Sequence, residues 1–330
     1  MIHARGLARS FRTRRGTVEA VRGIDVDVAP GELVGFLGPN GAGKTTTLRM
    51  LTTLLIPTAG TATVAGCDLL TDPLGVRRRI GYVGQAGGTG PDCQVLDELV
   101  LQGRFYGMSA HDAHRRGAEL LDQLHLGGTE HRRTGSLSGG QRRRLDIAMG
   151  LMHVPGLLFL DEPSTGLDPQ SRANLWQHIR ALHVEHAVTL FLTTHYLDEA
   201  DALCDRILVI DGGRIVAEGT PEELKSTVAG DTVALGTDAP ARVAELAATM
   251  PGASGVSVDA GVVSLRVPQA STALPALLRE LEATRITLES VEVHRPTLDD
   301  VFLTLTGRTL RDAEAGQPEP GPPEPALSAS

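Results

Sequence analysis

The sequence predicts an α/β domain followed by a small α+β domain, and three observations lead to this fold class. Residues 1–225 contain short apolar runs such as "GLLFLD" and "AVTLFLTT", typical of strands buried in a parallel sheet, with helical patterns between them. Residues 226–307 change to alternating strand and helix patterns without such runs. The 330 residues also exceed the usual size of one domain.

The elements of the first domain follow from the hydrophobic pattern. Residues 17–37 predict two strands separated by a "PGE" turn, and a helix is predicted from Thr45 to about Leu55 after a glycine-rich loop. The later strands are expected in "TATVAGCDL", "RRRIGYVGQ", "GLLFLDEP" and "AVTLFLTTH", and the later helices from about Leu96 to Leu126, after "LSGG", in "ANLWQHIRALHVEH" and in "DEADALC". The Gly-Gly pair in "RILVIDGGRIVAEG" predicts a hairpin.

The second domain is predicted over 226–307, in the order strand, helix, two strands, helix, strand, helix. Its last helix is expected in "TLDDVFLTLTG". Residues 308–330 are rich in Pro and Glu with few apolar side chains, so we expect a disordered tail there.

Composition excludes several classes of protein. The formal net charge of −9 argues against a broad basic surface, so we expect no nucleic-acid partner. The three cysteines are widely spaced without a CxxC pair, which disfavours a disulfide framework or a zinc site. No run approaches the roughly 20 apolar residues of a membrane span, so we expect a soluble chain whose membrane role would require a partner.

A phosphate-binding loop is the most specific motif. "GPNGAGKT" at 38–45 fits G-x-x-x-x-G-K-[ST], follows a predicted strand and precedes a predicted helix, as in P-loop NTPases. Lys44 is expected to contact the β- and γ-phosphates of ATP, and the Thr45 hydroxyl to bind Mg²⁺. The nucleotide-binding residues predicted here are Gly38, Pro39, Asn40, Gly41, Ala42, Gly43, Lys44, Thr45 and Thr46.

Polar residues at the ends of three other strands complete this site. Asp161 ends an apolar strand, where a carboxylate can hold Mg²⁺, and Glu162 beside it can polarise the attacking water. Alone, two adjacent acids could be a helix cap or surface charge. His195 ends the next apolar strand and could reach the γ-phosphate, and Gln85 in "YVGQ" could contact Mg²⁺ or water.

A second helix start suited to an anion lies far from the loop. Ser138, Gly139 and Gly140 in "LSGGQRRR" precede a helical pattern, and free N–H groups at a helix start favour phosphate. A second phosphate-binding helix end is redundant in one molecule that already has the loop at 38–45. It becomes useful if two copies pack head to tail, each closing over the ATP that the other holds.

The motifs "GPNGAGKT", "YVGQ", "LSGGQ", "LLFLDEP", "GLD" and "TTH" together resemble the ATP-binding subunit of ABC transporters over residues 1–225. The resemblance implies an ATP-binding domain with a helical subdomain, a homodimer with ATP sandwiched between copies, adenine stacking by Phe11 and a link between the two sites through Asp168. A single Phe in a strand is more usually a core residue, so the stacking role of Phe11 depends on the resemblance. "RRRLDIA", "TTHYLDEAD" and "TLDDVFLTLTG" resemble the daunorubicin-resistance type of drug exporter.

This resemblance implies a transport-coupled ATPase at the cytoplasmic face of the membrane, driving drug or secondary-metabolite efflux through a separate integral-membrane permease. One alternative is a non-transport ABC ATPase acting on ribosomes or DNA. Ribosome-acting members carry two such domains and DNA-repair members a long coiled coil, neither of which this sequence contains. A P-loop phosphotransferase would leave "LSGGQ" and His195 without a role.

Overall fold

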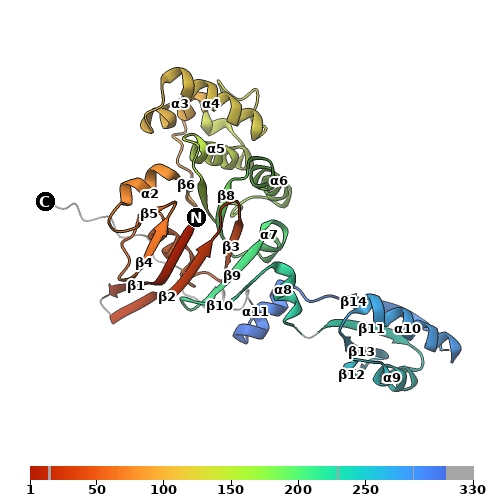
Figure 1. Ribbon diagram of the computed structural model, residues 1–330. Helices are drawn as coiled ribbons and strands as arrows, with labels where there is room; N and C mark the ends of the chain where they lie inside the picture. Colours follow the sequence, from red (N-terminus) through yellow and green to blue (C-terminus); the bar gives the residue numbers. More distant parts are fainter. Residues whose placement is uncertain (14–15, 229, 285, 310–330) are drawn as a thin grey trace. The chain divides into compact units, whose positions relative to one another are not determined.

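The computed structural model describes residues 1–13, 16–228, 230–284 and 286–309 (Figure 1). The chain forms two compact units. Of the described residues, the N-terminal unit contains Met1–Glu218 together with Arg308 and Thr309, and the C-terminal unit contains Gly219–Gly307. The contacts therefore divide the chain slightly before residue 225, where the sequence pattern places the boundary. Nearly all of the predicted tail, 308–330, lies outside the described residues.

The N-terminal unit is built on a buried sheet with the strand order β10-β9-β3-β8-β7-β6. Its parallel strands are β3 (Leu33–Leu37), β6 (Ile80–Val83), β7 (Leu157–Asp161), β8 (Thr189–Thr194) and β9 (Arg206–Asp211). The edge strand β10 (Arg214–Gly219) follows β9 through Gly212 and Gly213, both with positive φ, so the predicted Gly-Gly hairpin is confirmed. The parallel strands end together at one edge of the sheet, which holds the candidate site.

A second, antiparallel sheet of this unit has the order β2-β1-β4-β5. Its strands are β1 (Ile2–Thr13), β2 (Gly16–Val28), β4 (Ala59–Val64) and β5 (Cys67–Asp68). One apolar core joins side chains of this sheet, such as Ile2 and Val26, to Leu48 of helix α1 (Lys44–Leu51) and Phe36 of β3. Burial of these apolar side chains fixes α1 between the two sheets.

The remaining helices of the unit are α2 (Pro73–Arg79), α3 (Val95–Phe105), α4 (Ala110–Gln123), α5 (Gly139–Leu151), α6 (Pro169–His186) and α7 (Leu197–Leu203). Helices α3, α4 and α5 pack together as a helical subdomain (Figure 1). The prediction that "RRRI" belongs to a strand was wrong for its arginines, because Asp72 caps α2 and Pro73 occupies its first position, so the helix runs to Arg79. Cys93, in the segment before α3, is exposed, whereas Cys67 and Cys204 are buried.

The C-terminal unit begins with α8 (Pro221–Ser226) and continues as β11 (Asp231–Thr237), α9 (Pro240–Thr249), β12 (Ser254–Asp259), β13 (Val262–Val267), α10 (Ala270–Ala283), β14 (Leu288–His294) and α11 (Leu298–Thr306). This order confirms the predicted α+β pattern. The sheet has the order β12-β13-β11-β14, a ferredoxin-like arrangement, and its core lies against α9 and α10. None of the helices in the described part of the chain combines the length and apolar character of a membrane span.

Candidate functional site

The glycine-rich loop between β3 and α1 is shaped by close backbone contacts. Gly43 has φ 108°, and a Cβ atom on it would lie 2.5 Å from the carbonyl oxygen of Ala20 in β2, so a larger residue does not fit. The amide of Gly38 donates to the carbonyl of Thr194 at 3.3 Å, and the amide of Gly213 to the carbonyl of Ala42 at 3.0 Å. The ends of β8 and β9 therefore hold both ends of the loop.

Lys44 lies over its own loop and is only 4% exposed. Its ammonium donates to the carbonyls of Gly38 at 2.8 Å and Pro39 at 3.1 Å. The same Nζ lies 3.3 Å from Oε1 of Glu162. The loop thus brings one buried positive charge to the end of β7.

Glu162 is the centre of a small charged cluster. Its Oε2 lies 3.2 Å from Nδ1 of His195, opposite the contact of Oε1 with Lys44. Burial raises the pKa of the Glu162 carboxyl, but the contacts with His195 and the charge of Lys44 outweigh burial and lower the pKa to about 2. The carboxylate is therefore ionised at neutral pH.

The backbone of Glu162 is in the left-handed region, with φ 45°. A residue with a Cβ pays about 1–2 kcal/mol for this conformation, so neighbouring contacts must hold it. The Glu162 amide donates to the carbonyl of Thr193 at 3.1 Å and to its hydroxyl at 3.0 Å. Strand β8 thus fixes the turn that follows β7.

Asp161 and Thr45 form the second part of the cluster. The Thr45 hydroxyl donates to Oδ1 of Asp161 at 3.1 Å, and the Thr193 hydroxyl donates to the same oxygen at 2.7 Å. Burial raises the pKa of Asp161, while the hydrogen bonds from Thr193 and Thr45 oppose this shift. A hydroxyl from the loop and a carboxylate from β7 therefore meet at one point.

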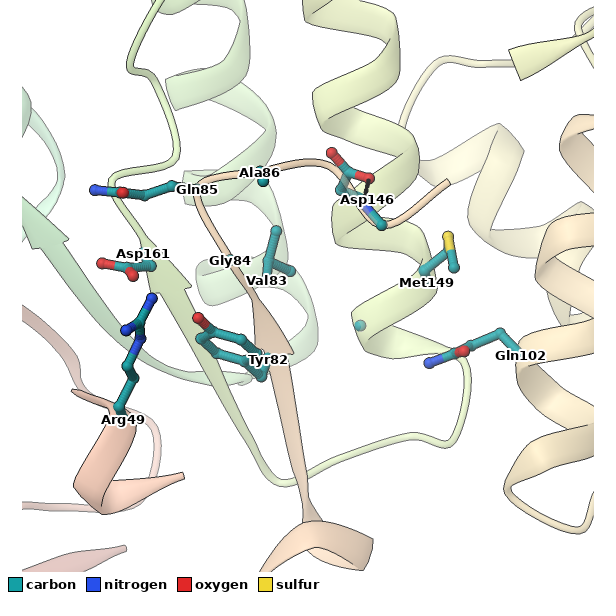
Figure 2. A pocket seen from close by; sticks show the side chains of 12 residues that line it. Arg49, Tyr82, Val83, Gly84, Gln85, Ala86, Gln102, Asp146, Met149 and Asp161 are labelled. Atoms are coloured by element: carbon teal, nitrogen blue, oxygen red, sulfur yellow. Dashed lines mark hydrogen bonds between the residues drawn. The ribbon is translucent and has the colours of Figure 1, made fainter. Parts of the chain in front are cut away.

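Gln85, in the loop after β6, lies beside this point. It lines a cavity of about 550 Å³ together with Asp161. Figure 2 shows the polar ends of Gln85, Asp161, Arg49 and Tyr82 on one side of this cavity, and Asp146, Met149 and Gln102 on the other. The cavity thus connects the end of β7 with helices α3 and α5.

The starts of α5 and α6 form a separate, exposed group. Ser138 caps α5: its hydroxyl accepts the amide of Gln141 at 3.2 Å, and the Gln141 side chain accepts the amide of Ser138 at 3.1 Å. Asp168 caps α6 by accepting the amide of Ser171 at 2.9 Å. A Cβ on Gly140 would lie 3.3 Å from Ser171, so the two helix starts adjoin.

Phe11 lies in neither group. It is half-buried on β1, paired with Val18 of β2, and the Arg9 guanidinium lies 4.7 Å from its ring centroid. Stacking of Phe11 on adenine stays a prediction.

Sequence reasoning missed two residues that shape the site, Thr193 and Arg143. Arg143 is 7% exposed and donates to the carbonyls of Gly84, Asp161 and Pro163. Helical spacing was the available signal, because Arg143 lies three residues after Gly140 and four before Ile147, both buried. A charged residue type predicts an exposed side chain, so the position of Arg143 on the buried face of α5 was not recognised from the sequence.

Comparison with known proteins agrees with this geometry. The family model "ABC transporter" matches residues 21–165, and the model "ATP-binding protein DrrA1-3-like, C-terminal domain" matches 219–306. The dimeric structure of the ATP-binding cassette MJ0796 bound to ADP and Pi is similar with a TM-score of 0.61 and 25% identity, covering 67% of this chain and 98% of that chain. The cbiO1 structure from Clostridium perfringens, part of the ABC transporter complex cbiONQ, gives a TM-score of 0.61 at 26% identity, covering 68% and 89%.

Curated relatives match nearly the whole chain. Daunorubicin resistance ATP-binding protein DrrA3 of Streptomyces coeruleorubidus is 43% identical, covering 92% of this chain and 96% of the relative. Doxorubicin resistance ATP-binding protein DrrA of Mycobacterium tuberculosis is 43% identical over 88% and 90%. Nod factor export ATP-binding protein I of Burkholderia lata is 38% identical over 92% and 97%. The chain therefore belongs to the ATP-binding subunits of ABC transporters, a family that hydrolyses ATP, and carries a C-terminal domain of the DrrA type.

Proposed function

We propose that this chain is the motor subunit of an ABC exporter, which hydrolyses MgATP to drive efflux of a drug or secondary metabolite through a separate membrane permease. The observation that carries the proposal is the meeting of Lys44, Glu162 and His195 within 3.3 Å contacts at the ends of α1, β7 and β8. A phosphate-binding lysine, a carboxylate and an imidazole at one point suit attack of water on a γ-phosphate.

The loop residues 38–46 bind the phosphates through backbone amides, with Lys44 as the point charge. A triphosphate would compete with the carbonyls of Gly38 and Pro39 and with Glu162 for the Lys44 ammonium. The Glu162 carboxylate is then free to accept a hydrogen bond from the attacking water. Phe11 stacks on the adenine in this proposal.

The oxygen atoms of Thr45 and Asp161 fit Mg²⁺, because a hydroxyl and a carboxylate 3.1 Å apart are ligands that this ion prefers. Gln85 would add an amide oxygen from the same cavity. When bound, Mg²⁺ would neutralise charge on the β- and γ-phosphate oxygens.

Glu162 accepts the hydrogen bond of the attacking water, and His195 holds the Glu162 carboxylate in place through its contact at 3.2 Å. The left-handed turn at Glu162 aims the carboxylate along the edge of the sheet where α1 begins. Gln85, which lines the same cavity as Asp161, would help orient the water.

A second copy of the chain completes the site in this proposal. The hydroxyl of Ser138 and the amides of Gly139 and Gly140 approach the γ-phosphate held by the other copy, and Asp168 connects the two sites. The exposed positions of Ser138, Gly139 and Asp168 at the starts of α5 and α6 support this arrangement.

Export and its location are inferred from the relatives. Their names refer to daunorubicin and doxorubicin resistance and to Nod factor export, so a drug or secondary metabolite is the proposed cargo. The chain would bind its permease from the cytoplasmic face of the membrane.

Two measurements test the proposal. Purified full-length chain should release inorganic phosphate from MgATP, and absence of release would refute the motor role. Cells that express the chain together with a candidate permease should retain less daunorubicin than cells with the Glu162→Gln variant and the same permease. If both kinds of cell retain the same amount of daunorubicin, the proposed cargo class is refuted, whereas the proposed ATP hydrolysis is not affected by this result.

A further inference from the structure

We propose that Arg143 is a positioning residue for ATP hydrolysis, which holds Glu162 and the start of the Gln85 loop in register with the helix that begins at Ser138. The inference rests on the proposed function, in which Glu162 activates water. Arg143 has no assigned role in that reaction, although it lies two residues after the "LSGGQ" stretch.

Three backbone carbonyls receive hydrogen bonds from the Arg143 guanidinium. Nε donates to Pro163 at 2.8 Å, Nη1 to Gly84 at 2.6 Å and Nη2 to Asp161 at 3.0 Å. A planar guanidinium has five donors in a rigid fork, so one side chain can serve three acceptors in fixed directions. A lysine ammonium is a point charge and cannot reproduce this geometry.

Two of these carbonyls belong to the residues on either side of Glu162. The left-handed backbone of Glu162 is therefore held from both directions, by Thr193 of β8 at its amide and by Arg143 of α5 at the flanking carbonyls. Such a strained conformation persists when the surroundings determine it fully. Loss of the α5 contacts would let the turn relax and move the carboxylate.

The third carbonyl connects the same guanidinium to the Gln85 loop. Gly84 directly precedes Gln85, so Arg143 joins the end of β6 to the end of β7. Asp146, one turn further along α5, lies 3.9 Å from Nη1 of Arg143 and accepts the amide of Gly88 at 3.4 Å. A shift of α5 would therefore be passed to both polar loops at once.

The two neighbouring arginines serve as matched controls. Arg142 donates to the carbonyls of Thr134 and Gly135, before the start of its own helix, at 3.5 and 3.3 Å. Arg144 donates to Asn174 of α6 at 2.7 Å. Replacing either Arg142 or Arg144 removes a guanidinium from the same helix. Neither of these side chains donates to the carbonyls beside Glu162, so both substitutions leave those contacts in place.

The test compares Arg143→Lys with Arg142→Lys and Arg144→Lys in the full-length chain. We expect kcat for MgATP to fall on the order of 100-fold in Arg143→Lys, because a small misplacement of a catalytic group has an effect of this size. KM and ATP affinity should stay within about twofold, since the phosphate loop is untouched. A kcat equal to that of the two controls, or an equal loss in kcat and ATP affinity, would overturn the inference.

A double-mutant cycle separates positioning from general destabilisation. In a Glu162→Gln background, Arg143→Lys should lower the residual rate little further, because both changes act through the same carboxylate. An undiminished loss in that background would contradict the positioning role. If Arg143→Lys does not yield folded, ATP-binding protein, Arg143→Gln is measured instead, and failure of both to fold would assign Arg143 to the fold alone. Failure of the proposed function is distinct, because Glu162→Gln itself would then leave hydrolysis unchanged.

Discussion

The two glycine-rich helix starts of the N-terminal unit are built in opposite ways. Helix α1 begins after Gly43, which provides no side-chain cap, and its first residue Lys44 is buried against Glu162. Helix α5 begins after Ser138, which is exposed and forms a complete capping box with Gln141. We call the start of α1 the closed start, because Lys44 is covered by residues of its own chain. We call the start of α5 the exposed start, because its capping box lies at the surface.

This difference shows what each start can still bind. At α1, the Lys44 ammonium lies beside Glu162 of the same chain, so a phosphate bound to Lys44 would lie next to Glu162. At α5, the capping box uses the oxygen of Ser138 as an acceptor, which leaves its hydroxyl hydrogen and the amides of Gly139 and Gly140 as donors. A helix start with free donors at the surface suits an anion brought by another molecule.

The largest effect is expected at the closed start. Glu162→Gln should lower the rate of ATP hydrolysis by about 10²- to 10⁴-fold, because the amide cannot accept a proton from water. ATP binding should persist, and ATP should trap a dimer visible by size-exclusion chromatography. Normal turnover together with a monomer in ATP would remove Glu162 from the reaction.

The exposed start should respond differently. Ser138→Arg should lower hydrolysis by about 10²- to 10³-fold, as expected for loss of a donor to the transition state, while ATP affinity of the isolated monomer stays unchanged in calorimetry. The substitution also removes a helix cap worth about 1 kcal/mol. Ser109→Arg is the matched control, since Ser109 caps α4 by accepting the amide of Asp112 at 3.0 Å.

Hydrolysis should survive in the Ser109→Arg control. A weakened ATP affinity in Ser138→Arg monomers would mean that Ser138 contacts the nucleotide of its own chain. The contrast between the two helix starts would then be lost.

Lys44→Ala tests the closed start by affinity. We expect ATP binding to weaken about 10- to 100-fold, because charge-assisted hydrogen bonds to the phosphates are removed. Hydrolysis should fall with it. Isothermal titration calorimetry is the measurement, and unchanged affinity would place the phosphates elsewhere.

A smaller, pH-dependent effect is expected in the packing behind the exposed start. His178 of α6 is buried, and burial together with the charges of Arg144 on α5 and His125 after α4 lowers its pKa to about 4. The unfolded chain binds this proton near pH 6.5 and the folded chain only near pH 4, so stability is lost as pH falls from 6.5 toward 4.

The free energy of unfolding should therefore drop by up to about 2 kcal/mol more in the unmodified chain than in His178→Gln between pH 7 and pH 5. Nε2 of His178 also lies 3.1 Å from Oδ1 of Asn174, an oxygen that can only accept a hydrogen bond, and the side-chain amide of a glutamine can donate to the same oxygen. The free energy of unfolding of both proteins is measured by urea denaturation as a function of pH. If it falls equally with pH in the unmodified chain and in His178→Gln, the pKa of His178 is not lowered in the folded chain.

The sequence predicted the elements that rest on strong periodicity or on a complete motif. The apolar runs before Asp161 and His195 predicted parallel strands, and glycine spacing predicted the loop before Lys44. It did not predict α2, because three arginines before an apolar strand mask a helix whose signals are Asp72 and Pro73. The left-handed turn at Glu162 depends on Thr193, which is distant in sequence, so no local pattern could reveal it.

Arg143 shows a related limit. Three identical residues in a row occupy three different directions around a helix, and only the packed structure distinguishes the side chain that donates to Gly84 and Asp161 from its neighbours. From residue type alone, all three arginine side chains would be predicted to be exposed to solvent.

The exposed Cys93 makes this chain convenient for spectroscopy. It lies between the Gln85 loop and α3, and the other two cysteines are buried, so a maleimide probe should label this position selectively. Hydrogen bonding to the Glu98 carboxylate raises the pKa of the Cys93 thiol, so labelling should be faster in mildly alkaline buffer. A spin label there would place one reporter on each copy without any engineered cysteine, and the distance between two labels would follow ATP-dependent pairing directly.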